Sequence, residues 1–129
     1  MTAEVSQEFE WPSQGHEVSY EDIRQIISNP REIVLIDVRG REEFNMGNIP
    51  NSVNLPLDEL NDSMSITNDE FLKKFGFIRP QIDTKIVLTC RTGRRSGIAY
   101  GHLLDFGYKS VLNYPGSWNE YSERISGKL

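Results

Sequence analysis

The stretch Lys85–Phe106, KIVLTCRTGRRSGIAYGHLLDF, decides the fold of this chain. An apolar run, Ile86–Leu88, leads to the only cysteine, Cys90, and a loop containing Gly93 follows it. A pattern typical of a helix begins at Ser96. This order predicts a buried strand, a tight loop and a helix. Such a loop directs backbone N–H groups and the positive end of the helix dipole at one point, so the sequence predicts an anion-binding loop at Cys90.

The predicted loop combines this cysteine with three arginines. A helix N-terminus and neighbouring cations lower the pKa of a thiol from about 8.5 towards roughly 3.5–7.5. We therefore expect Cys90 to be a thiolate at neutral pH and to act as a nucleophile. Guanidinium groups provide paired N–H donors for an oxyanion, whereas the alternative, a small cysteine in the core, would not be surrounded by cations. The candidate substrate-binding residues are Arg91, Thr92, Gly93, Arg94, Arg95 and Ser96.

A second apolar run also ends beside charged residues. Ile33–Ile36 is continuous, as is typical of a strand that helices cover on both faces, and Asp37 and Arg39 follow it. Ligands of open α/β sheets bind at the carboxyl ends of strands, so we expect this end to neighbour Cys90. We expect Asp37 and Arg39 to support the loop, with Asp37 accepting hydrogen bonds from it. A turn-forming role for Asp37 stays open beside that one.

Helix signals alternate with these strands. Three pairs have the spacing of a capping box at a helix start: Ser19 and Asp22, Thr67 and Glu70, and Ser117 and Glu120. The stretch between Pro56 and Thr67 is polar and predicts no element. Trp118 follows a turn at Gly116 and either lines the Cys90 pocket or packs in the core. The alternation indicates an α/β protein with a central, mostly parallel sheet.

The order and spacing of several short motifs resemble the rhodanese (sulfurtransferase) domain over roughly residues 17–125. These motifs are Asp37–Arg39, Arg41–Phe44, Gly47–Pro56, Cys90–Ser96, Phe106–Tyr108 and Tyr114–Trp118. Asn48 departs from the family pattern, because many relatives have His there, and we interpret that position as structural. The resemblance implies a three-layer rhodanese-like α/β fold with a central, mostly parallel five-stranded sheet flanked by helices.

The resemblance also implies a chemistry. Sulfurtransferases of this fold have a six-residue active loop, here Cys90–Arg95, whereas the related phosphatases have seven residues and a Cys-x5-Arg signature. Residue 96 is Ser, so the loop is too small for a phosphoryl group. The chain is thus expected to be a thiosulfate sulfurtransferase that carries sulfur as a persulfide on Cys90, without a cofactor or a metal. The donor would be thiosulfate or a persulfide, and the acceptor cyanide, glutathione or a protein thiol such as that of thioredoxin.

Three other functions remain open at this point. A catalytically idle rhodanese-type module would bind or regulate a partner, but such modules commonly lack the cysteine. A phosphatase or arsenate reductase of the same fold is disfavoured by the loop length. A redox sensor would use Cys90 as an oxidisable thiol, although the chain has no second cysteine to resolve it.

The composition limits the possible partners, the cellular compartment and the kinds of site. A chain of 129 residues with a net charge of −5 is expected to form one domain, and the charge argues against nucleic acids or anionic membranes as partners. One cysteine excludes an internal disulfide and favours a reducing compartment. His16 and His102 are too few and too far apart for a metal site. We expect a monomer.

The first residues differ from a targeting signal. Residues 1–16 are acidic and polar, unlike a mitochondrial presequence or a secretory signal, and no run approaches the ~20 apolar residues of a membrane span. We therefore expect residues 1–16 to form an N-terminal tail and residues 17–129 a single rhodanese domain. A cytoplasmic location is expected, with a mitochondrial one as the alternative if a presequence precedes this chain.

Overall fold

The computed structural model describes residues 9–29 and 32–127. The helices are α1 (Tyr20–Ser28), α2 (Arg41–Met46), α3 (Leu57–Ser63), α4 (Asn68–Phe75), α5 (Arg94–Asp105) and α6 (Ser117–Ile125). The strands are β1 (Ile33–Asp37), β2 (Ser52–Asn54), β3 (Lys85–Thr89) and β4 (Ser110–Asn113). All three strand pairings are parallel, in the order β2-β1-β3-β4, so the expected α/β class with a parallel sheet is confirmed.

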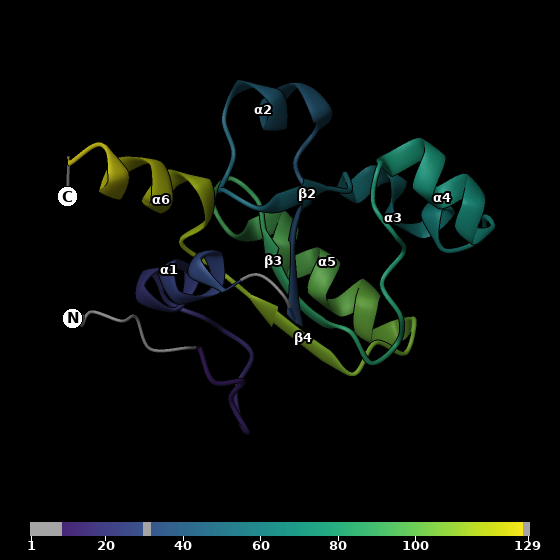
Figure 1. Cartoon of the computed structure of the whole chain (residues 1–129), viewed down its shortest axis with the longest axis horizontal. Helices are drawn as coiled ribbons and strands as arrows, with labels where there is room; N and C mark the ends of the chain where they lie inside the picture. Colours follow the sequence, from purple (N-terminus) through teal and green to yellow (C-terminus); the bar gives the residue numbers. More distant parts are fainter. Residues whose placement is uncertain (1–8, 30–31, 128–129) are drawn as a thin grey trace.

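Helices cover both faces of this sheet (Figure 1). On one face α1 and α6 contribute Ile23, Ile26 and Tyr121 to a core with Val87 and Leu112. On the other face lies a second core, which includes Leu60 of α3, Phe71 of α4, Ala99 and Leu103 of α5, and Ile36, Ile86 and Leu88 of the sheet. Alternate residues of each strand point to opposite cores, which explains why the strands are apolar throughout.

The sheet has four strands in the described residues, and the expected fifth strand was wrong. Beyond β4 there is a single bridge between Glu17 and Asn113. Asn113 donates its N–H to the carbonyl of His16 at 2.7 Å, and its carbonyl accepts the N–H of Val18 at 2.9 Å. Ser19, the N-cap of α1, follows at once, so the chain turns into a helix before a strand can extend.

The capping boxes were predicted correctly at two of the three helix starts. Ser19 caps α1 and Thr67 caps α4, each with its acidic partner. The third prediction was wrong, because the N-cap of α6 is Gly116 and no side chain caps this helix. The hydroxyl of Ser117 is instead turned towards Cys90, as described below.

The register of β1 and β3 places the two predicted strand ends together. Asp37 is the pairing partner of Thr89, the residue before Cys90, so the proximity of these ends is confirmed. Helix α5 begins at Arg94, two residues earlier than the sequence pattern predicts, with Gly93 as N-cap. Among the described residues, no helix is both long and apolar enough to cross a membrane.

Candidate active site

Cys90 follows β3 and lies at the base of a short loop that ends in α5. The side chain is buried, with 1% of the residue exposed, and its Sγ accepts the backbone N–H of Gly93 at 3.1 Å. Gly93 has a φ of +93°, and a Cβ at this position would lie 2.5 Å from the carbonyl oxygen of Pro115. Only glycine fits both conditions, so the tight turn over the sulfur depends on this residue.

The pKa of the Cys90 thiol is lowered by its surroundings. Burial is the largest single influence and raises the pKa. It is outweighed by the hydroxyl of Ser96 and by the backbone N–H groups of Ser96, Gly93 and Thr92, which all lie near the sulfur. The Gly93 N–H donates to the sulfur itself, and the Ser96 hydroxyl also donates to the carbonyl of Gly93 at 3.2 Å. These donors belong to the first turn of α5 and the loop before it, where the N–H groups have no partner within the helix. The site thus favours a thiolate.

The three arginines of the loop are in different surroundings. Arg91 and Arg94 are exposed, and neither side chain has a hydrogen-bond or ion-pair partner in the part of the chain that the structure describes. Arg95 is half-buried and forms a paired contact with Glu43 of α2, with N–O distances of 2.7 and 3.1 Å. Arg91 and Arg94 can therefore bind an anion directly, whereas Arg95 is already paired.

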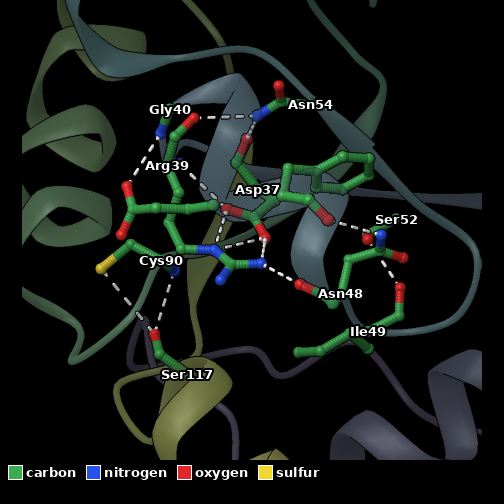
Figure 2. Close-up of polar contacts among 12 residues, drawn as sticks. Asp37, Arg39, Gly40, Asn48, Ile49, Ser52, Asn54, Cys90 and Ser117 are labelled. Carbon is green, nitrogen blue, oxygen red and sulfur yellow. Dashed lines mark hydrogen bonds and ion pairs between the residues drawn. The ribbon is translucent and has the colours of Figure 1, made fainter.

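Asp37 and Arg39 form a buried ion pair beside the loop (Figure 2). The Asp37 carboxylate accepts the Arg39 side chain at 2.8–3.1 Å and the Arg39 backbone N–H at 2.9 Å. Arg39 also donates to the carbonyl of Gly47 at 2.6 Å, and the Asn54 amide donates to the carbonyls of Asp37 and Arg39. The carboxylate of Asp37 therefore contacts Arg39 and not the Cys90 loop.

Trp118 connects this ion pair to the loop. Its ring lies 5.3 Å from the Arg39 guanidinium and packs against Gly47, where an added Cβ would come within 2.8 Å of the indole. Its backbone N–H donates to the carbonyl of Cys90 at 3.0 Å. Arg39 can thus support the Cys90 loop through Trp118.

Comparisons with known proteins identify the family of this chain. The family described as "Rhodanese-like domain" matches residues 19–124, which is most of the chain. The chain belongs to the rhodanese-like family. In Schizosaccharomyces pombe, a putative mitochondrial thiosulfate sulfurtransferase is 43% identical over 98 residues, covering 76% of this chain and 69% of that protein.

The matches to human proteins cover almost the whole of the matched chain. The human thiosulfate:glutathione sulfurtransferase is 31% identical, and the match covers 84% of this chain and 95% of that protein. The solved structure of the human single-domain sulfurtransferase TSTD1 superposes with a TM-score of 0.80 at 28% identity, covering 86% of this chain and 98% of the other. These names agree with the expected class of enzyme, a rhodanese-type sulfurtransferase.

This rhodanese site contains a residue that sequence reasoning assigned elsewhere. Ser117 is fully buried, accepts the Cys90 backbone N–H at 3.1 Å and lies with its Oγ 3.9 Å from the sulfur. Its hydroxyl donates to the Tyr114 carbonyl at 2.8 Å. The φ of Ser117 is +56°, a conformation that is uncommon for residues other than glycine. Sequence reasoning missed this contact because the spacing of Ser117 and Glu120 predicted that the Ser117 hydroxyl caps α6.

Glu43 is the second residue that the sequence did not single out. It is separated from Arg95 by 52 positions, so no local spacing indicates the contact. Asn48, interpreted as structural, donates its amide to the carbonyl of Phe44 at 2.8 Å, at the end of α2. Within residues 9–29 and 32–127, no three His, Cys, Asp or Glu side chains are grouped to hold a metal ion.

Proposed function

We propose that this protein is a rhodanese-type sulfurtransferase that carries a sulfane sulfur as a persulfide on Cys90. The observation that supports this proposal most is the N–H of Gly93 lying 3.1 Å from a sulfur whose pKa is lowered. A thiolate held by backbone amides is a nucleophile that needs no general base. The same donors stabilise negative charge on the outer sulfur of the persulfide.

The reaction is a double displacement. The Cys90 thiolate attacks the outer sulfur of thiosulfate, the S–S bond of the donor breaks, and sulfite leaves with the electron pair. In the second half, an acceptor thiolate attacks the outer sulfur of the persulfide, and the electron pair of the broken bond returns to Cys90. Arg91, Arg94 and Arg95 hold the anionic donor, and the amides of Thr92, Gly93 and Ser96 hold the reacting sulfur. Asp37, Arg39 and Trp118 support the loop, and Trp118 forms a wall of the pocket.

The acceptor is a thiol that reaches a recessed sulfur. The outer atom of a persulfide stands about 2 Å beyond Cys90, so a slender thiol such as glutathione, or an exposed protein thiol such as that of thioredoxin, is a suitable acceptor. The name of the human relative includes glutathione, which supports the first choice. We propose that the protein acts as a monomer in the cytoplasm. The mitochondrial relative keeps the mitochondrial alternative open, and a fluorescent fusion of the full-length protein would distinguish the two.

Mass spectrometry of the intact protein tests the persulfide. After incubation with thiosulfate, the wild-type protein should gain the mass of one sulfur atom, and subsequent addition of glutathione should remove it. The Cys90→Ser variant should gain nothing, because its hydroxyl cannot form a persulfide.

An exposed residue far from the loop provides the control for this experiment. The Ser126→Ala variant alters a hydroxyl that donates only to Glu123 at the end of α6, so it should gain one sulfur like the wild type. No mass gain in the wild type with thiosulfate or any persulfide donor would contradict the proposal. Hydrolysis of an aryl phosphate would favour the phosphatase alternative instead.

A further inference from the structure

Helix α2 is attached to the molecule mainly by polar contacts. None of its residues, Arg41–Met46, is buried, and Figure 1 shows it standing apart from the sheet. A short helix without a buried face receives little stability from packing. Two of its side chains form ion pairs with other helices: Glu43 pairs with Arg95 of α5, and Arg41 pairs with Glu59 of α3 and also lies over the Phe75 ring of α4. These contacts therefore determine where α2 lies.

The contact between Glu43 and Arg95 joins α2 to the active loop. Each carboxylate oxygen of Glu43 accepts one guanidinium N–H, and Oε1 also accepts the backbone N–H of Gly40 at 3.1 Å. Hydrogen bonds from Arg95 are the largest influence on Glu43 and lower its pKa to about 2. The ionised Glu43 carboxylate stabilises the folded protein. This stabilisation is complete above the ordinary pKa of a glutamate, about 4.3, and is lost as the pH falls through about 2. Glu43 is thus charged throughout the working pH range.

Arg95 also interacts with the reacting group. Its pKa is raised first by Glu43 and then, among weaker influences, by the charges of Cys90 and Asp37. About a third of each side chain of the pair is exposed, 32% for Arg95 and 36% for Glu43, so an incoming anion can reach the guanidinium. Ion pairs of this exposure are weak, and a bound dianion can therefore compete with one.

We propose that Glu43 competes with the anionic sulfur donor for the Arg95 guanidinium and thereby sets the affinity of the site for anions. This inference rests on the sulfurtransferase function proposed above. In the empty site Arg95 binds Glu43. When thiosulfate enters, its sulfonate oxygens take over the N–H groups of Arg95, and Glu43 and α2 are released from α5.

The same exchange assists the release of the product. After the donor bond breaks, sulfite remains as an anion on Arg91, Arg94 and Arg95. Because Glu43 stays charged, it can reclaim Arg95 and displace sulfite, which clears the persulfide for the acceptor. Glu43 is a positioning residue in this scheme, since it touches Arg95 and not the reacting sulfur.

The Glu43→Gln variant tests this competition. Glutamine keeps an oxygen for the Gly40 N–H but has no charge, so Arg95 becomes free for the donor. The KM for thiosulfate should fall about two- to fivefold, the range that corresponds to a weak exposed ion pair. Inhibition by added sulfite should strengthen by a similar factor. A KM that is unchanged or higher would overturn the inference.

Two further variants separate competition from simple support of α2. Glu59→Gln breaks the other ion pair of α2 and leaves Arg95 untouched, so the KM for thiosulfate should stay at the wild-type value. In an Arg95→Gln background, adding Glu43→Gln should no longer change the KM, because the contested group is gone. Equal effects of Glu43→Gln and Glu59→Gln, or an undiminished effect without Arg95, would show a structural role and contradict the proposal.

Calorimetry separates this inference from the proposed function. Binding of thiosulfate to Cys90→Ser, with and without Glu43→Gln, measures anion affinity in the absence of turnover. Tighter binding in the double variant supports competition at Arg95, and equal binding overturns it. Absence of a persulfide in the wild type would instead count against the sulfurtransferase function.

Discussion

The ionisation of Cys90 is decided by two opposing effects on one atom. Burial disfavours the thiolate, whereas the Ser96 hydroxyl and the amides of Thr92, Gly93 and Ser96 favour it, and the net pKa is lowered. The sequence predicted a lowered pKa from the arginines and the helix end. The largest lowering influences are the hydroxyl and amide of Ser96 and the amides of Gly93 and Thr92, which belong to that helix end and the loop before it. The heads of Arg91 and Arg94 are exposed to water, where charges are screened.

The pH dependence of Cys90 alkylation tests this balance. Because the pKa is lowered, the thiolate persists as the pH falls past the ordinary pKa of a free cysteine, and reactivity is lost only below that value. Ser96→Ala removes the strongest lowering group, so its midpoint should move to higher pH. The measurement is the rate of carboxamidomethylation by iodoacetamide from pH 5 to 10. Ser122→Ala, which removes an exposed hydroxyl of α6, should titrate like the wild type, and an unshifted midpoint in Ser96→Ala would contradict the assignment.

At the scale of elements, the active loop depends on how closely α5 and α6 approach it. Helix α5 begins at Arg94, and the backbone of its N-cap, Gly93, lies against Pro115. Helix α6 begins after Gly116, and the N–H groups of Trp118 and Asn119 donate to the carbonyls of Cys90 and Arg91 at 3.0 Å each. The N-terminal ends of two helices therefore fix the loop from opposite sides.

Two glycine substitutions in α5 should have opposite effects. Gly93→Ala places a Cβ 2.5 Å from the Pro115 carbonyl at a φ of +93°, so we expect a loss of stability of more than about 1–2 kcal/mol and a loss of persulfide formation. Gly97→Ala meets nothing within 4 Å and should stabilise the helix by roughly 0.5–1 kcal/mol while sulfur loading persists. Urea unfolding and intact mass measure both effects. Equal stability of the two variants would contradict the account of the loop.

At the scale of the whole molecule, two cores on opposite faces of one sheet hold the site in place. Phe9 and Trp11 are partly buried and pack against the core under α1 and α6, although they precede the domain boundary that the sequence suggested. The carbonyl of His16 accepts the Asn113 N–H at the edge of β4. We propose that residues 17–129 fold as a domain. We expect the residues before them to add to the stability of that domain.

Truncation of the chain tests that proposal. A protein of residues 17–129 should fold and take up sulfur, but its free energy of unfolding should be lower by roughly 1–3 kcal/mol, because partly buried apolar surface and one backbone hydrogen bond are lost. A protein of residues 9–129 retains these contacts and should be more stable than residues 17–129 by that amount. Urea denaturation measures the difference. Failure of residues 17–129 to fold would contradict the boundary, and unchanged stability would contradict the contribution of Phe9 and Trp11.

Much of the fold could be predicted because its signals are local. The apolar runs of β1 and β3, the glycine of the active loop and the capping boxes of α1 and α4 each lie within a few residues. Helix α3 was missed because its N-cap is Pro56 and no side chain caps it. The fifth strand was implied by the family and is reduced here to one bridge.

The sequence by itself determined that the single cysteine follows a buried strand and precedes a helix. It also determined that the loop between them contains a glycine and three arginines. Only the tertiary structure decided that Ser117 holds the Cys90 amide and that Arg95 is paired with Glu43. The physical reason is the range of the interactions. Capping, turns and apolar periodicity act between neighbours in the chain, whereas these contacts join residues 27 and 52 positions apart, which only the packing of α6 and α2 around the loop brings together.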